Sequence, residues 1–348
     1  MPRRMAFTGP YQVEILEYEE PQLQPGQVRI RTELASGKHG TTTGMFDGRT
    51  FAGQRFDQEM RLFVEAEGAA PPTASREHPW NAGTTGVGTV IEAASDVTGF
   101  NVGDHVFGLM DIRETNVVDQ QWLWALDDID PEQALCIEPA YVAFHAIRES
   151  QIRYGDSVVV IGLGVLGLLA TRMAVQAGCE KVFAVDMLPN RRAWALRHGA
   201  DDVFDPREND VARRIHELTG GAGVDVAIEL AGVTPALQTA IRCVRNTGTV
   251  CSAGFYQGEA KGLYLGREWH HNRLTIVVPH GCGWGHPPRD YPRWDQKRAY
   301  DALAGLLRTG KLDVPGLITP VVALEEGADV FRLIREEPDK VIKYAVRF

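Results

Sequence analysis

The spacing of hydrophobic residues changes near residue 156 and divides the chain into two kinds of pattern. Before that point, short runs in which apolar and polar residues alternate are separated by Gly, Pro and Asp, which predicts β-strands. The runs that fit this description are Val13–Tyr18, Gln27–Glu33, Val87–Ala93 and His105–Leu109. The polar stretch Met45–Ser75 follows neither period and is predicted to be a long irregular excursion. The first 150 residues are therefore expected to be mostly β.

Beyond residue 156, strand-like and helix-like stretches alternate. The run Ser157–Ile161 is continuous and β-branched, as in strands buried on both faces of a parallel sheet. The later strands are expected at Lys181–Asp186, Asp202–Phe204, Val224–Glu229, Gly248–Ala253 and Leu274–Val278. The helices are expected at Leu166–Gly178, Asn190–His198, Glu208–Thr219, Pro235–Val244 and Asp295–Leu312, and two last strands at Ile318–Val322 and Val341–Arg347. This alternation predicts right-handed βαβ units and a doubly wound parallel sheet in an α/β protein.

A G-x-G-x-x-G sequence lies between the first of these strands and the first helix. Gly162 is expected to make the tight turn, Gly164 to let the backbone approach a pyrophosphate, and Gly167 to let helix and strand pack closely. The helix start at Val165 and Leu166 offers unpaired N–H groups and the positive end of the helix dipole to phosphates. The motif is weak alone, but the strand before it and the helix after it are the context that it requires.

Asp186 closes the next strand, where a carboxylate can accept hydrogen bonds from the adenosine ribose hydroxyls. It would repel a 2′-phosphate, so the sequence predicts NAD rather than NADP. Arg191 follows as a further cofactor-binding candidate, and Arg191 with Arg192 could soften that preference. A ligand-free glycine turn and a Rossmann fold that binds S-adenosylmethionine remain as alternatives.

Composition narrows the class of protein. A chain of 348 residues suggests about two domains, and 44% hydrophobic with 24% charged residues is ordinary for a globular protein. The net charge of −10 argues against a nucleic-acid partner. A mean hydropathy of −0.19 and the lack of a long apolar run predict a cytoplasmic protein with no membrane partner. The five cysteines include no C-x-x-C pair, which predicts reduced thiols and no structural zinc lobe.

Several segments together resemble the medium-chain dehydrogenase/reductase superfamily of zinc alcohol, threonine and polyol dehydrogenases. The resemblance extends over nearly the whole chain. The segments that carry it are Gly103–Val106, Glu138–Ala146, Gly162–Gly167 and Gly221–Gly232 with Asp225 and Glu229. It implies a GroES-like β-barrel catalytic domain built from both chain ends, expected at residues 1–150 and 285–348, around a Rossmann NAD-binding domain at 151–284. It also implies a homodimer or homotetramer, often paired through the last Rossmann strand, here Leu274–Val278.

The resemblance fails where the family holds its catalytic zinc. His39 stands in the place of the usual cysteine, Thr84 in that of the histidine and Thr85 in that of the glutamate of the G-H-E step. Glu138 is present, but the family's glutamate in this segment can also lie outside the coordination sphere. Zinc needs three thiolate, imidazole or carboxylate ligands, and threonine hydroxyls are poor substitutes. The sequence therefore predicts no bound metal.

Without zinc, a positioned acid/base must take the proton of the alcohol. His39 is the first candidate and Lys38 the second, provided that burial lowers the pKa of the lysine. Thr42 and Thr84 could relay protons or orient the carbonyl, and Glu138 could set the tautomer of His39. Each residue also has an ordinary structural interpretation: a loop histidine, a solvated lysine, hydrogen bonding in a turn, or a junction carboxylate.

These observations predict an NAD-dependent enzyme that interconverts a secondary alcohol and its ketone, with a polyol, sugar or related hydroxy compound as the substrate. Three alternatives stay open at this point. They are a zinc-free enone or quinone reductase, a non-catalytic NAD(H)-binding regulatory protein, and a redox step retained inside a net non-redox reaction.

Overall fold

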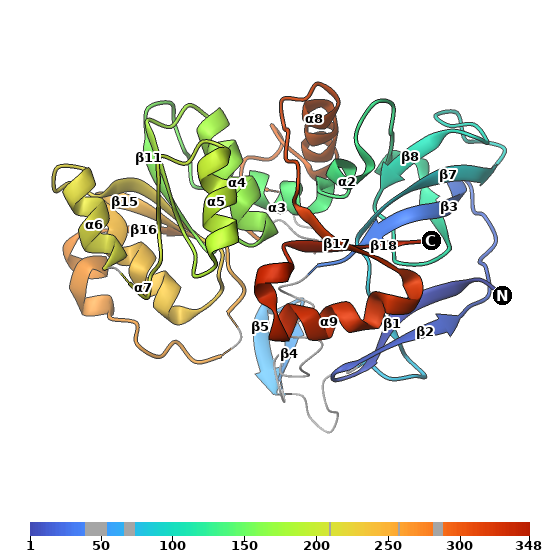
Figure 1. Cartoon of the computed structure of the whole chain (residues 1–348), viewed down its shortest axis with the longest axis horizontal. Helices are drawn as coiled ribbons and strands as arrows, with labels where there is room; N and C mark the ends of the chain where they lie inside the picture. The colour runs from blue at the N-terminus through green and yellow to red at the C-terminus, as the bar shows by residue number, and fades with distance from the viewer. Residues whose placement is uncertain (39–53, 66–73, 209, 257, 281–287) are drawn as a thin grey trace. The chain divides into compact units, whose positions relative to one another are not determined.

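The computed structural model describes residues 1–38, 54–65, 74–208, 210–256, 258–280 and 288–348. The chain forms two compact units, which are treated separately below. The terminal unit combines the two chain ends, Met1–Leu135 and Ile318–Phe348, and the central unit is Cys136–Leu317. Figure 1 shows the elements of both.

The central unit contains a parallel sheet with the strand order β13-β12-β11-β14-β15-β16. The strands are β11 (Ser157–Ile161), β12 (Lys181–Val185), β13 (Asp202–Phe204), β14 (Val224–Glu229), β15 (Val244–Ser252) and β16 (Thr275–Val277). The order reverses between β11 and β14, and this reversal is the topological switch point beside which ligands bind in such sheets. The predicted doubly wound sheet is confirmed.

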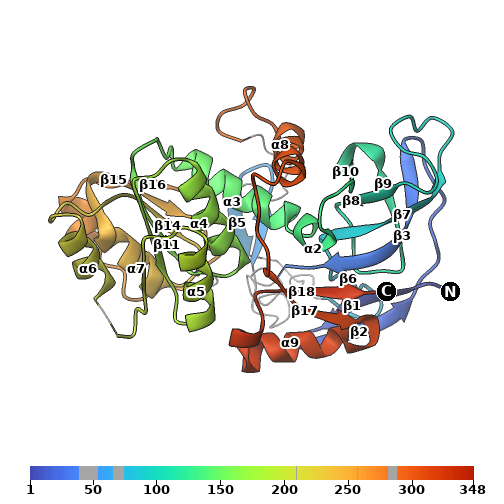
Figure 2. The same ribbon diagram turned by 45° about the horizontal axis from the view of Figure 1, so that its top comes forward.

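Helices cover both faces of this sheet. They are α3 (Ile137–Glu149), α4 (Val165–Gln176), α5 (Pro189–Arg197), α6 (Val211–Leu218), α7 (Thr234–Cys243) and α8 (Gln296–Arg308), with a short π-helical turn, η2 (Leu265–Trp269). Helices α4 and α5 lie on one face and α6 and α7 on the other, as Figures 1 and 2 show. Ile215 of α6 and Ile241 of α7 pack against Val159 and Phe183 of the sheet, so two-sided burial explains the apolar strands.

Helix α3 was not predicted, because the sequence before residue 150 was interpreted as mostly β. It packs against α4 and α8, and Tyr141 stacks on Tyr300 with ring centroids 4.4 Å apart. Pro315 follows α8, and its carbonyl accepts from the indole N–H of Trp194 of α5 at 2.9 Å. These contacts hold α3, α8 and the following segment in the central unit. Its limits, 136 and 317, therefore differ from the predicted Rossmann limits of 151 and 284.

The terminal unit is built mainly of antiparallel strands. They are β1 (Arg3–Gly9), β2 (Gln12–Glu17), β3 (Gln27–Ser36), β6 (Trp80–Asn81), β7 (Thr85–Ala93), β8 (His105–Gly108), β9 (Thr115–Asp119), β10 (Leu123–Ala125), β17 (Ile318–Ala323) and β18 (Lys343–Arg347). Its helices are α2 (Pro131–Ala134), α9 (Gly327–Glu336) and the short η1 (Gln120–Trp122), η3 (Leu324–Glu326) and η4 (Pro338–Lys340). Strand β18 pairs with β3, with Val346 opposite Ala35, so the two chain ends share one sheet. Phe331 of α9 packs on Phe7 and Tyr344 and joins the same core.

The excursion predicted at Met45–Ser75 is not wholly irregular. Strands β4 (Gln54–Asp57) and β5 (Leu62–Glu65) form an antiparallel hairpin in which Phe56 is opposite Phe63. The two rings meet edge to face at 5.2 Å. Such a cross-strand aromatic pair stabilises a hairpin whose sequence pattern is too short to predict it.

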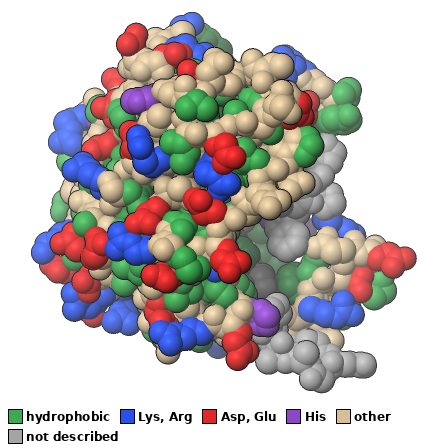
Figure 3. Space-filling view, turned by 90° about the vertical axis from the view of Figure 1, so that its right-hand side faces the viewer, with side chains coloured by type: hydrophobic (Ala, Val, Ile, Leu, Met, Phe, Trp, Pro, Cys, Tyr) green, Lys and Arg blue, Asp and Glu red, His purple; other side chains and the backbone are tan. Residues whose placement is uncertain are grey.

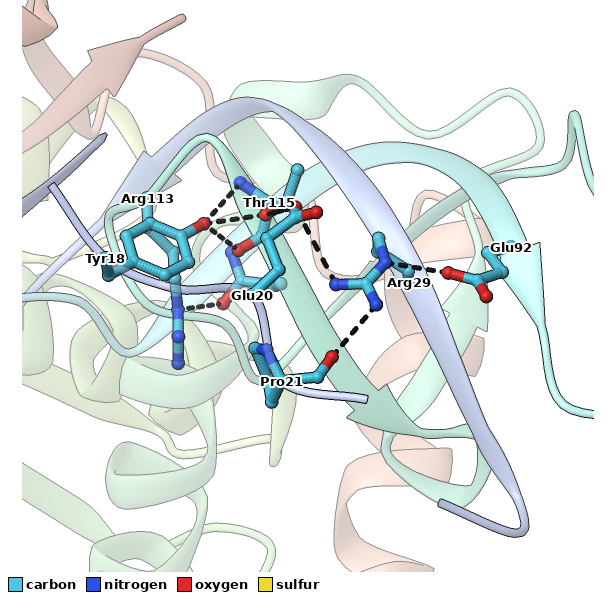
Figure 4. Close-up of polar contacts among 8 residues, drawn as sticks. Tyr18, Glu20, Pro21, Arg29, Glu92, Arg113 and Thr115 are labelled. Carbon is cyan, nitrogen blue, oxygen red and sulfur yellow. Dashed lines mark hydrogen bonds and ion pairs between the residues drawn. The ribbon is translucent and has the colours of Figure 1, made fainter. Parts of the chain in front are cut away.

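A polar network fixes the chain between β2 and β3 to the sheet, as Figure 4 shows. The Tyr18 hydroxyl donates to the carbonyl of Thr115 at 2.8 Å. Arg29 donates to Glu92 at 2.8 Å and to the carbonyl of Pro21 at 2.9 Å. Side chains of this kind supply hydrogen-bond partners for backbone groups that have none in the sheet.

Acidic and basic side chains are interspersed on the face seen in Figure 3, and no large area of that face carries one sign. Within the described ranges, no helix is both long and apolar enough to span a bilayer.

Candidate dinucleotide and active site

The glycine loop after β11 is shaped for close approach of a ligand. Gly162 has a φ of 90°, and a Cβ there would lie 2.5 Å from the backbone nitrogen of Ala231. A Cβ on Gly167 would lie 1.9 Å from the carbonyl oxygen of Gly162. By contrast, a Cβ on Gly164 would meet no described heavy atom within 4 Å. Two glycines are therefore required by the fold itself, whereas the third leaves a bare backbone surface that fits a pyrophosphate.

Helix α4 begins directly at this surface. Its first turn is Val165 and Leu166, and no side chain of the described residues caps it at Gly164. The helix is mostly apolar and is buried from Gly167 to Ala174 apart from Arg172, so its axis is fixed by the core. An uncapped, rigid helix start concentrates donor N–H groups and positive dipole, which suits an anionic ligand.

Asp186 follows β12 and is tied to the glycine loop. Its Oδ2 accepts from the backbone N–H of Leu163 at 2.7 Å, and its Oδ1 accepts from Leu188 at 2.8 Å. The Arg191 guanidinium lies 3.8 Å from Oδ2, and burial lowers the pKa of that guanidinium. Each carboxylate oxygen has further acceptor capacity, so Asp186 can still accept ribose hydroxyls while it holds the loop.

Glu229 ends β14 at the switch point, opposite Ile161 of β11. Its Oε1 accepts from the backbone N–H groups of Ala231 and Gly232 at 2.8 and 2.9 Å, and its Oε2 accepts from the Tyr256 hydroxyl. Burial raises the pKa of Glu229 despite these donors. Sequence analysis identified Glu229 within a family segment but missed Tyr256, since no local pattern links residues so far apart.

In the terminal unit, Lys38 and Thr84 belong to neighbouring segments. The Thr84 N–H donates to the carbonyl of Ser36 at 2.8 Å, and Ser36 pairs with Thr85 across β3 and β7. The Thr84 hydroxyl lies 3.5 Å from both the Ser36 carbonyl and the Thr85 hydroxyl, and Thr85 is fully buried. Lys38 is half-buried. The structure therefore brings the end of β3 and the start of β7 together, as a shared site requires.

A buried lysine on β18 supports the same segment and was missed by the sequence analysis. Lys343 is 1% exposed, and its Nζ donates to the carbonyl of Gly37 at 2.9 Å. A Cβ on Gly37 would lie 2.1 Å from the carbonyl oxygen of Ala82 and 2.4 Å from the Tyr344 hydroxyl. The residue before Lys38 is thus packed against Ala82 and Tyr344 and bonded to Lys343. The sequence feature that could have identified Lys343 is its position as a single lysine in the apolar run Val341–Val346.

The carboxylate of Asp111 holds the segment that leads into β7. Its Oδ1 accepts from the backbone N–H of Gly83 at 2.7 Å, and burial raises the pKa of this carboxyl. Because Gly83 precedes Thr84, this bond fixes the position of Thr84 directly before β7, which begins at Thr85.

The remaining candidates are His39, Thr42 and Glu138. His39 and Thr42 lie outside the described residues. Glu138 is buried in the first turn of α3, in the central unit. A carboxylate there also stabilises a helix start, so its structural interpretation has physical support. The catalytic roles of His39, Lys38, Thr42, Thr84 and Glu138 stay predictions.

The described residues include no group of three or more His, Cys, Asp or Glu that could hold a metal ion. At the position aligned with the family's histidine ligand stands Thr84, whose neutral hydroxyl does not fit the donor set of catalytic zinc.

Comparisons with known proteins agree with this geometry. The zinc-binding dehydrogenase family matches residues 165–296. D-guloside 3-dehydrogenase of Escherichia coli K12 is 34% identical over 99% of this chain and 100% of its own. (R,R)-butanediol dehydrogenase of Bacillus subtilis is 28% identical over 90% of each chain. A crystal structure of an alcohol dehydrogenase from E. coli CFT073 complexed with NADH superposes with a TM-score of 0.77, at 18% identity, over 100% and 99% of the two chains.

The chain therefore belongs to the medium-chain dehydrogenase/reductase superfamily, and the predicted fold, a GroES-like β domain with a Rossmann domain, is confirmed. Its relatives include the guloside and butanediol dehydrogenases named above and a D-xylulose reductase of Aspergillus oryzae.

Proposed function

We propose that this protein is an NAD-dependent dehydrogenase that interconverts a secondary alcohol of a sugar, glycoside or polyol with its ketone. The observation that carries the proposal is the link between the glycine loop and Asp186, in which one carboxylate holds Leu163 and can still accept ribose hydroxyls. The name of the 34% identical relative, a dehydrogenase of a guloside, supports the substrate class.

The central unit would hold the cofactor through its own backbone and side chains. The bare surface at Gly164 would receive the pyrophosphate, the N–H groups of Val165 and Leu166 would donate to it, and Gly162 and Gly167 would keep the turn tight. Arg191 beside Asp186 would add a cation at the adenosine end. When bound, the nicotinamide ring accepts or returns the hydride of the substrate carbon.

The chain itself would move the proton, since the aligned ligand positions do not suit zinc. We assign the substrate hydroxyl proton to His39 or Lys38, with Thr42 and Thr84 as hydroxyls able to orient the substrate and Glu138 as a positioning residue. The packing of Gly37 and the Lys343 bond would restrict the movement of Lys38. With the proton carried by a side chain, the proposed enzyme would need no metal.

Cofactor binding, substrate turnover and metal dependence test the proposal in that order. Titration with NADH, followed by nicotinamide fluorescence, should show saturable binding, and failure to bind would overturn the whole account. Reduction of NAD should then be measured with a panel of glycosides and polyols. Oxidation of NADH and NADPH by enones and quinones should be measured in parallel, because it tests the reductase alternative. Activity should survive dialysis against a chelator, and elemental analysis should find no stoichiometric zinc. Loss of activity with zinc removal would contradict the metal-free step alone.

A further inference from the structure

Three arginines and two aspartates meet beyond the carboxyl ends of β12 and β13. At their centre is Asp205, which follows Phe204 of β13 and has a side chain that is only 3% exposed. Its Oδ1 accepts from the backbone N–H and Nε of Arg207 at 3.0 and 2.9 Å. Its Oδ2 accepts from Arg207 Nη2 at 2.6 Å and from Arg192 Nη1 at 3.0 Å. One carboxylate thus holds two guanidinium groups.

Both guanidinium groups lie at the residues that close β12. Arg192 Nη1 also donates to the carbonyl of Asp186 at 2.7 Å, and Arg207 Nη2 donates to the carbonyl of Met187 at 2.7 Å. This is the end of β12 at which Asp186 would accept the ribose hydroxyls. A phosphate on the 2′-hydroxyl would therefore arrive among these arginines, which are the residue type that recognises it in NADP-dependent sheets.

We propose that Asp205 is a specificity-determining residue that keeps Arg192 and Arg207 from binding the 2′-phosphate of NADP(H). This inference rests on the proposed function and adds the group that sets the cofactor preference. Asp205 occupies two of these three arginines, Arg192 and Arg207. A 2′-phosphate would therefore meet the charge of Asp186 together with Arg191, which is itself paired with that aspartate. The preference for NAD then depends on two carboxylates, of which the sequence pattern identified only Asp186.

Charge and exposure indicate which arginine would respond. The Arg207 guanidinium beside Asp205 holds the pKa of that carboxyl well below its usual range, so Asp205 stays ionised at working pH. The Arg207 side chain is 60% exposed, whereas that of Arg192 is 18% exposed. Arg207 is therefore free to turn towards a ligand once the charge of Asp205 is removed, while Arg192 is confined.

The test is the ratio of NADPH to NADH affinity, measured by fluorescence titration without any substrate. For Asp205→Asn we expect this ratio to rise at least tenfold over the wild type. The matched control is Glu217→Gln, because Glu217 also pairs with two arginines, Arg213 at 3.2 Å and Arg214 at 3.0 Å, on helix α6. It removes the same charge elsewhere and should leave the ratio unchanged.

A second variant keeps the proposal testable if Asp205→Asn does not fold. Arg207→Ser alone should leave NADPH affinity within twofold of the wild type, since Asp205 already holds this arginine. In the Asp205→Asn background the same change should abolish the gain. The proposal is overturned if Asp205→Asn binds NADH normally without a change in ratio, if Glu217→Gln shifts it equally, or if Arg207→Ser alone weakens NADPH binding. Failure of the wild type to bind either dinucleotide would instead refute the proposed function.

Discussion

The carboxylate of Asp186 accepts a hydrogen bond from the backbone N–H of Leu163 at 2.7 Å, so the acid that closes the second strand of the sheet also holds the loop that follows the first. A single side chain thereby couples loop shape to recognition of the cofactor. Removal of this carboxylate should lower both the stability of the fold and the affinity for the cofactor. Different substitutions should lower the two quantities by different amounts.

For Asp186→Ala, we expect a loss of about 1–3 kcal/mol in the free energy of unfolding, because the N–H groups of Leu163 and Leu188 lose their acceptor. NADH affinity should fall at least tenfold. Asp186→Asn keeps one oxygen as an acceptor and should be less destabilised, yet it should still bind NADH more weakly. Denaturation curves and NADH titration measure the two effects, and unchanged NADH affinity in both variants would contradict the assigned role.

The glycines of the loop should respond to alanine in opposite ways. Gly164→Ala adds a methyl group into open space at a φ of −65°, so stability should change by less than about 0.5 kcal/mol. Its NADH affinity should nevertheless fall at least tenfold, because the methyl group occupies the surface assigned to the pyrophosphate. Gly167→Ala places a methyl group 1.9 Å from the carbonyl oxygen of Gly162 and should destabilise the fold by about 2 kcal/mol or more. Normal NADH binding by Gly164→Ala would place the pyrophosphate elsewhere.

Tyr256→Phe should produce a pH-dependent loss of stability. Burial raises the pKa of Glu229 in the folded state, so this carboxyl favours folding below its ordinary pKa and loses that contribution as the pH rises through the raised pKa. The Tyr256 hydroxyl opposes the loss because it donates to the ionised form. We expect the variant to be about 1–3 kcal/mol less stable than the wild type near pH 7 and closer to it near pH 4, where the carboxyl is protonated. Urea unfolding at the two pH values checks this, and a loss that is equal at both would argue against it.

Lys343→Met should disturb the segment that leads to Lys38. The methionine fills similar volume but leaves the buried carbonyl of Gly37 without its donor, at a cost of about 1–3 kcal/mol. If this segment positions the proton carrier, kcat should fall more than KM changes. Arg347→Met, at an exposed position on the same strand, should change stability by less than about 0.5 kcal/mol and leave kcat unaffected. A purely structural role for Lys343 would lower stability with kcat per folded molecule unchanged.

Much of the central unit could be predicted because its signals are local. The β-branched run Ser157–Ile161, the glycines at 162, 164 and 167, and the helix that follows are neighbours in the chain, and their order encodes a strand, a turn and a helix start. Asp186 could be found for the same reason, since it ends the next strand.

Contacts between distant residues could not be predicted in this way. Helix α3 is fixed by packing on α4 and α8, including the stack of Tyr141 on Tyr300. The sequence before residue 150 was interpreted as mostly β and did not predict this helix. The hairpin β4–β5 depends on the pairing of Phe56 with Phe63. The partners of Glu229 and Gly37, Tyr256 and Lys343, are remote in the chain and become visible only when the strands are assembled.

The sequence by itself determined the superfamily, the alternation that builds the parallel sheet and the glycine loop, because each is encoded in short segments whose residues are neighbours in the chain. Only the tertiary structure decided how the charges at the ends of β12 and β13 are shared among Asp186, Asp205 and the arginines, and which carbonyl the buried Lys343 holds. The physical reason is that electrostatic and hydrogen-bond partners are chosen by distance in space, which the order of residues along the chain does not specify.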